Sequence, residues 1–222
     1  MPDGGVPLGE YADAIRQVKL EIGLKVVVHT GLVSESVAEK LAYAHVDAAL
    51  MDVVGSNETI HRICRSKADV EDYERSLAFL SKAGIPLVPH ILVGLHHGHL
   101  KGEFNAVEMI SKYNPNAVVI IALTPARGTA MESVDPPAPE DIVRVLLTAR
   151  TKLPRTPIAL GCVRPRGRHR GLTDILAVRS GVNAIAFPSR QAVEEAKSLG
   201  LGTSFSPLCC CQVHQDITPV EA

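Results

Sequence analysis

Short apolar runs alternate regularly with longer stretches of helical periodicity, and this alternation constrains the fold more than any other feature of the chain. The apolar runs are almost continuous, which is typical of strands buried on both faces. They occupy residues 25–30, 47–52, 86–94, 117–123, 157–161 and 183–187. The intervening stretches carry apolar residues three or four positions apart, as in Ile142, Val145, Leu146 and Ala149. The pattern predicts a parallel sheet with right-handed helical crossovers.

Helices are expected between the runs and at both ends of the series. Their ranges are 8–22, 34–44, 56–84 (with a break near 65–67), 101–113, 141–153, 173–180 and 190–199. About six strand–helix units are too few to close an eight-stranded barrel and suit an open sheet. The predicted fold class is therefore α/β, a partial TIM-type (β/α) barrel over residues 1–205 with a cysteine-rich tail over 206–222. Since no strand precedes the first helix, one interpretation is that two units are missing from the start.

Size and charge narrow the functional classes. The 222 residues are 46% hydrophobic, which is enough for one sizeable core and too little for two comfortable domains. A formal net charge of −1 gives no reason to expect a nucleic-acid or membrane partner. No leader is recognised, and no apolar run reaches the roughly 18 residues of a membrane span. The sequence thus predicts a soluble, cytoplasmic protein.

The cysteines divide into isolated positions and one consecutive group. An odd total of five argues against a disulfide framework. Cys209, Cys210 and Cys211 are adjacent, and thiolates packed so closely suggest a metal, an iron–sulfur cluster or redox chemistry. An unstructured tail whose thiols have no role is the alternative. Cys162 is a weaker candidate ligand.

Polar residues directly after the apolar runs are the candidate functional residues, because barrels place their working groups at the carboxyl ends of the strands. Asp52 would bind a ribose or act as a base, although an N-cap role competes for Asp52 and for Ser56. Imidazoles in residues 95–99 (LHHGH) would bind a divalent ion or face solvent or substrate. Four arginines in residues 164–170 (RPRGRHR) would bind phosphate or carboxylate, or form a solvated basic loop.

At these positions the sequence resembles the radical S-adenosylmethionine enzymes related to biotin synthase. The matching segments follow the order of that family's barrel from its fourth strand to its eighth. They are residues 51–60 (MDVVGSNETI), 84–95 (GIPLVPHILVGL), 124–131 (TPARGTAM), 160–168 (LGCVRPRGR) and 181–187 (GVNAIAF). The resemblance extends over about residues 6–205 and implies a radical enzyme that uses S-adenosylmethionine and an iron–sulfur cluster.

Within this group the chain is most similar to the second subunit of two-subunit lipoyl synthases. Residues 2–8 (PDGGVPL), residues 93–103 and the cysteine-rich end carry that similarity. It implies sulfur insertion into a protein-bound octanoyl chain, with a partner radical subunit and a lipoyl-domain substrate. It also implies cofactor-binding roles for His29, Asp52, Ser56, Asn57, His90, Arg127 and Arg164. By the same analogy, Cys209, Cys210 and Cys211 would hold an auxiliary cluster.

The sequence departs from the family at its defining motif. No cysteines show the Cys-x3-Cys-x2-Cys spacing that holds the radical-generating cluster, and Val27 and Val88 stand where biotin synthase has auxiliary-cluster cysteines. That cluster needs three thiolates and one free iron to chelate S-adenosylmethionine. The sequence therefore predicts the C-terminal part of a radical enzyme, inactive alone, either because it is truncated or because it is degenerate.

Two other functions remain open, so whether the chain is itself an enzyme is undecided. One is a cofactor-free barrel lyase or isomerase acting on an anionic metabolite. It would use Arg164 and Arg168 as anion clamps and His90 or His96 as acid–base groups. The other is a non-catalytic subunit of a radical complex, since an open barrel leaves strand edges free to pair with a partner.

Overall fold

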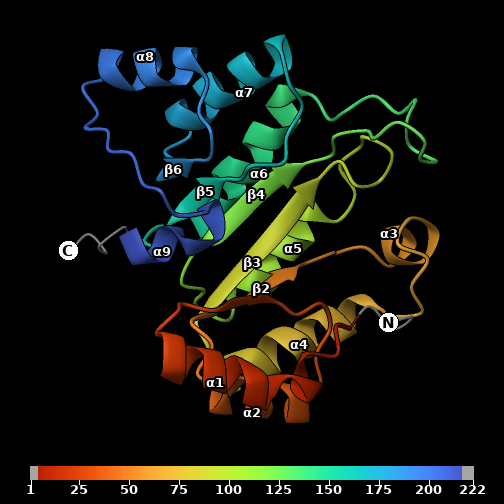
Figure 1. Ribbon diagram of the computed structural model, residues 1–222. Coiled ribbons are helices and arrows are strands. Elements are labelled where there is room, and N and C mark those ends of the chain that lie inside the picture. The colour runs from red at the N-terminus through yellow and green to blue at the C-terminus, as the bar shows by residue number, and fades with distance from the viewer. Residues whose placement is uncertain (1–4, 217–222) are drawn as a thin grey trace.

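The structure, a computed structural model that describes residues 5–216, is built on one parallel sheet (Figure 1). Its six strands neighbour one another in sequence order. They are β1 Val27–His29, β2 Ala48–Asp52, β3 Leu87–Val93, β4 Val118–Ala122, β5 Ile158–Leu160 and β6 Ala184–Ile185. Sequential order is the arrangement of a TIM-type barrel, and here the sheet is open between β1 and β6. The predicted fold class is confirmed.

Helices follow the strands as expected. The main ones are α1 Ala12–Ile22, α2 Glu35–Tyr43, α3 Asn57–Arg62, α4 Val70–Lys82, α5 Glu103–Ser111, α6 Pro139–Lys152, α7 Arg168–Arg179 and α8 Arg190–Ser198. A short 3-10 turn, η1 Leu8–Glu10, precedes α1. The break expected near residues 65–67 separates α3 from α4. The helix expected from residue 173 begins at Arg168 instead, because its first turn is a polar, arginine-rich run that conceals helical periodicity.

Polar caps fix where several of these helices begin. Ser34 accepts a hydrogen bond from the Val37 amide at 3.3 Å, and Ser189 accepts one from the Ala192 amide at 3.3 Å. Asp69 and Asp72 form a reciprocal capping box at the start of α4. Each cap satisfies an amide that the helix leaves unpaired, so the strand-to-helix turns are set locally.

Helices cover one face of the sheet, whereas α3 lies beyond the strand ends (Figure 1), and a large aliphatic core lies between the helices and the strands. Ile120, Leu146 and Leu160 belong to this core and are almost fully buried. None of the helices in residues 5–216 is both long enough and apolar enough to cross a membrane.

The C-terminal segment packs against the other, inner face of the sheet. Its 3-10 turn η2 (Cys210–Gln212) and short helix α9 (Val213–Asp216) lie in front of the strands in Figure 1, opposite α5 and α6. Cys211 and Val213 join a buried cluster with Leu50, Val88 and Val119. Residues 210–216 of the tail are therefore structured, because these apolar side chains complete the inner core, while a role for its thiols stays a prediction. Residues 217–222 of the expected tail lie outside the described residues.

Candidate functional site

Three polar side chains gather where β1, β2 and β3 end. His29, Asp52 and His90 each lie two positions after an inward-facing valine or leucine, so the two-residue period of a strand puts them on the inner face. The register pairs Asp52 directly with His90. The rings of His29 and His90 have centroids 5.2 Å apart. The structure thus brings together three of the residues predicted to bind cofactor.

His90 is the most strongly perturbed member of this group. It is 5% exposed, and the ring Nδ1 lies 3.0 Å from the Val88 carbonyl oxygen. Burial is the main cause that lowers its pKa to about 4; the nearby His29 contributes to this shift, and Asp52 partly opposes it. A neutral imidazole at this position donates from Nδ1 to the carbonyl and leaves Nε2 as an acceptor.

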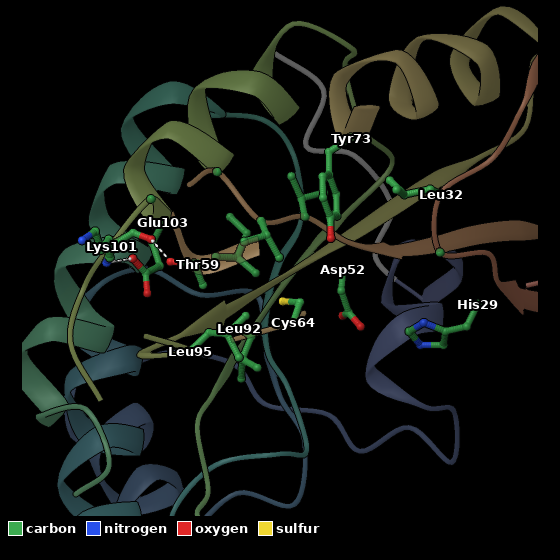
Figure 2. A pocket seen from close by; sticks show the side chains of 16 residues that line it. His29, Leu32, Asp52, Thr59, Cys64, Tyr73, Leu92, Leu95, Lys101 and Glu103 are labelled. Atoms are coloured by element: carbon green, nitrogen blue, oxygen red, sulfur yellow. Dashed lines mark hydrogen bonds between the residues drawn. The ribbon is translucent and has the colours of Figure 1, made fainter. Parts of the chain in front are cut away.

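A cavity of about 270 Å³ opens beside these residues at the strand ends. Figure 2 shows Asp52 between His29 and the hydroxyl end of Tyr73, with Leu32, Leu92 and Leu95 among the apolar walls. The volume approaches the lower end of typical small-molecule sites, and a few polar groups among apolar walls are typical of them. The shape and lining suit a compact, partly apolar ligand.

Tyr73 and Cys64 enclose the carboxylate of Asp52 from the helical side. Burial raises the pKa of Tyr73 to about 12, with smaller contributions from Cys64 and Asp52. Burial also raises the pKa of the Cys64 thiol, and Asp52 adds to the shift. Both groups are therefore protonated at neutral pH, which leaves Asp52 facing hydrogen-bond donors rather than further negative charge.

Glu103 organises the loop that closes the other end of the cavity. One carboxylate oxygen accepts from the Gly94 amide at 2.8 Å and the other from the Lys101 amide at 2.5 Å. Burial raises the pKa of Glu103, and these donors offset part of that shift. The Lys101 ammonium group pairs with Glu58 on α3. The β3–α5 loop is thus tied to its own strand and to α3.

A close approach of two backbones fixes the floor of this region. A Cβ atom on Gly55 would lie 2.3 Å from the Gly102 carbonyl oxygen and 2.6 Å from the Ala106 amide nitrogen. Gly102 itself has a φ of 105°. Only glycine fits at both positions, because the β2–α3 turn and the start of α5 touch through their main chains.

Two predicted cofactor ligands have structural partners instead. The Ser56 hydroxyl caps α3 by accepting from the Thr59 amide at 3.4 Å, which is the N-cap alternative considered for it. The Asn57 side chain accepts from the Val70 amide at 2.7 Å and so ties α3 to α4. Neither lines the cavity. Their cofactor-binding roles stay predictions.

The two predicted arginine ligands also lie away from the cavity. Arg127 is exposed on the loop after β4. The Arg164 side chain is completely buried and binds Asp174 through Nε at 2.8 Å and Nη2 at 3.2 Å. Its Nη1 donates to the Gly161 carbonyl at 2.6 Å. With these protein partners Arg164 joins the end of β5 to α7, and a ligand-binding role for it also stays a prediction.

The cysteines predicted as metal ligands are neighbours. The Sγ atoms of Cys209 and Cys210 are 3.9 Å apart, and the Cys162 amide donates to the Cys210 thiol. Burial raises the pKa of Cys210 and Cys211 to about 12. Within residues 5–216, however, no three His, Cys, Asp or Glu side chains are arranged to hold a metal ion. The same finding applies to the histidine run, where His96 lies 3.1 Å from the Thr59 hydroxyl.

Sequence reasoning missed several residues that line the cavity, notably Tyr73, Cys64 and Lys101. Tyr73 lies within α4, where its spacing indicates only a buried helical face. Cys64 follows α3 and is far from any strand end in the sequence. Lys101 lies eight positions after Val93, the last residue of β3, so only the folded loop brings it back to the cavity.

The region that holds the cavity matches a known family. The family model described as the radical SAM superfamily matches residues 2–101. Biotin synthase from Prochlorococcus marinus is 27% identical over 186 residues, which are 82% of this chain and 54% of the relative. The chain therefore spans about half the length of the curated relatives that it matches.

Solved structures share the fold. The FeFe-hydrogenase maturase HydG has a TM-score of 0.63 at 16% identity, over 84% of this chain and 44% of that one. The HMG-CoA lyase from Brucella melitensis has a TM-score of 0.58 at 12% identity, over 87% of this chain and 73% of that one. Identities this low show the fold alone. The sequence matches show that this chain is similar to biotin synthases over 82% of its length and to the radical SAM superfamily model over residues 2–101.

Proposed function

We propose that this chain binds S-adenosylmethionine in the cavity at the ends of β1, β2 and β3, as part of a radical enzyme. One observation carries the proposal: all residues lining the cavity except Gly102 and Glu103 lie within the segment that matches the radical SAM family model. The polar lining comes from strand ends, where barrels hold their ligands.

The lining residues suit a nucleoside. Asp52 has carboxylate oxygens available to accept hydrogen bonds from the two ribose hydroxyls. Leu32 and Leu95 offer apolar contact to a base. His90, held neutral by burial, adds no positive charge that would repel a sulfonium ion. S-adenosylmethionine, when bound, would supply the 5′-deoxyadenosyl group, which is released when a radical enzyme reductively cleaves its bond to sulfur.

The radical-generating cluster does not fit the residues that the structure describes. Cys64 is the one cysteine of the described residues that lines the cavity, and the other four lie after β5 and in the C-terminal segment. We propose that the three thiolates come from a partner radical subunit or another polypeptide segment. We further propose that the complete enzyme inserts sulfur into an octanoyl chain on a lipoyl domain, as the resemblance to lipoyl synthase implies.

Calorimetric titration of S-adenosylmethionine into the chain tests the binding step without any cluster. We expect binding, weakened about tenfold by Asp52→Asn because a charge-assisted hydrogen bond becomes a neutral one. Asp13→Asn, on the exposed start of α1, is the matched control and leaves affinity unchanged. Absence of binding, or equal affinities for all three proteins, contradicts the proposal.

Formation of 5′-deoxyadenosine tests the catalytic part separately. Under reducing, anaerobic conditions the chain alone is expected to form none. A fusion to a segment with the Cys-x3-Cys-x2-Cys motif is expected to form it after reconstitution with iron and sulfide. A reconstituted fusion that binds S-adenosylmethionine but does not cleave it refutes the radical function and leaves a binding function.

A further inference from the structure

The loop between β5 and α7 concentrates positive charge that the fold does not neutralise. Residues 164–170 carry four arginines. Arg164 occupies both carboxylate oxygens of Asp174, and one of these oxygens also accepts from the Ser189 amide at 2.7 Å. Asp174 is therefore fully engaged with Arg164 and the backbone, and the other arginines have to find a partner elsewhere.

The side chains of Arg166, Arg168 and Arg170 make no ion pair or hydrogen bond within residues 5–216. The Nε atom of Arg170 is shielded from water and has no hydrogen-bond partner. Burial lowers the pKa of Arg170, and the positive charges of Arg164 and Arg166 lower it further, while Asp174 partly opposes the shift. A buried donor without an acceptor is rare in folded proteins, so this guanidinium group is suited to bind an acceptor from outside the chain.

The N-terminus of α7 adds to this excess of donors. Gly167 precedes the helix with no side-chain cap, and the first turn contains no acidic residue. The amides of residues 168–170 make no hydrogen bond in the described part of the chain. Free amides and the helix dipole give a helix N-terminus a partial positive charge that attracts anions. Arginines at the same place are repelled by this charge unless an anion lies between the arginines and the helix.

The surroundings leave space for such a charge. A Cβ atom built on Gly167 would meet no atom within 4 Å, so the start of α7 is open. His169 is held in place, with Nε2 2.8 Å from the Pro137 carbonyl and Nδ1 3.2 Å from the Thr173 hydroxyl. The loop is thus anchored to its neighbours while its arginines remain available.

We propose that residues 166–170 and the N-terminus of α7 bind a phosphate-type dianion, the phosphate of a free ion or of a phosphorylated ligand. Guanidinium forks bind two phosphate oxygens at once, and the helix amides add donors for a third. Three guanidinium groups and a helix N-terminus match a dianion better than the single charge of a carboxylate. S-adenosylmethionine has no phosphate, so this site is additional to the proposed cofactor cavity.

Calorimetric titration of inorganic phosphate into the full chain at constant ionic strength tests the site. We expect saturable binding, weakened about tenfold or more in the Arg166→Gln/Arg168→Gln variant, which loses two charge-assisted contacts. Both side chains are exposed, so the fold should survive, and the melting temperature checks this. The matched control is Arg155→Gln, which is expected to keep wild-type affinity. Arg155 is exposed and lies before β5, at the end of the strand opposite to the proposed site.

Two further titrations distinguish binding by guanidinium geometry from binding by charge alone, and phosphate from a carboxylate. Arg166→Lys/Arg168→Lys keeps the charges but not the forks and is expected to bind with intermediate affinity. Acetate at equal ionic strength is expected to bind more weakly than phosphate. The proposal is overturned if phosphate gives no more heat than chloride, if the glutamine variant binds as tightly as wild type, or if acetate equals phosphate.

Discussion

Replacing Asp174 by Asn should be among the most destabilising single changes in the chain. The Asp174 and Arg164 side chains are both 0% exposed and form a two-contact ion pair. The variant keeps the size of the side chain but leaves Arg164 as a buried cation with only carbonyl and amide acceptors. Breaking one side of a buried pair costs about 3–5 kcal/mol. With a urea slope of about 3 kcal/mol per M, the unfolding midpoint should fall by about 1–2 M.

The exposed pair Arg190–Glu194 provides the matched control. Its side chains are 89% and 56% exposed, and Glu194→Gln should change the free energy of unfolding by no more than about 1 kcal/mol. Urea unfolding at pH 7, followed by circular dichroism, measures both variants. Replacing both buried partners, Arg164→Met with Asp174→Leu, should be less harmful than Asp174→Asn. This reasoning would be refuted if Asp174→Asn and Glu194→Gln had the same urea unfolding midpoint.

Two further predictions concern the cavity. The pKa of His90 is about 4 in the folded chain and 6.5 in the unfolded chain, so the unfolded chain binds more protons between these pH values. The contribution of His90 to the free energy of unfolding is therefore fully present above pH 6.5. It falls by about 3 kcal/mol as the pH drops to 4. His90→Asn should remove this part of the pH dependence in urea titrations at several pH values, and an unchanged slope contradicts it. Gly55→Ala should lower stability by about 1–3 kcal/mol by forcing α5 from the β2–α3 turn, whereas Gly202→Ala, which meets no atom within 4 Å, should not. Equal melting temperatures for the two alanine variants would show that the close approach is not required.

The order of elements was predictable from local sequence patterns. The apolar runs that became β2, β3 and β4 are long, aliphatic and separated by periodic helices, so their burial on both faces required no tertiary information. The N-cap role of Ser56 was also predictable, because its hydroxyl lies three positions before the Thr59 amide from which it accepts a hydrogen bond. The candidate positions of His29, Asp52 and His90 followed from strand ends alone.

The partners of those residues depended on tertiary contacts. Four arginines in one loop look equivalent in sequence, yet only Arg164 meets the buried carboxylate of Asp174, which is ten positions away on α7. Likewise Tyr73 reaches the cavity because α4 packs beside β2, not because of any local motif. The sequence by itself determined which segments become strands and helices, since that depends on periodicity within a few residues. Only the tertiary structure decided which polar groups are paired inside the fold and which remain available to a ligand, because pairing depends on where distant segments meet.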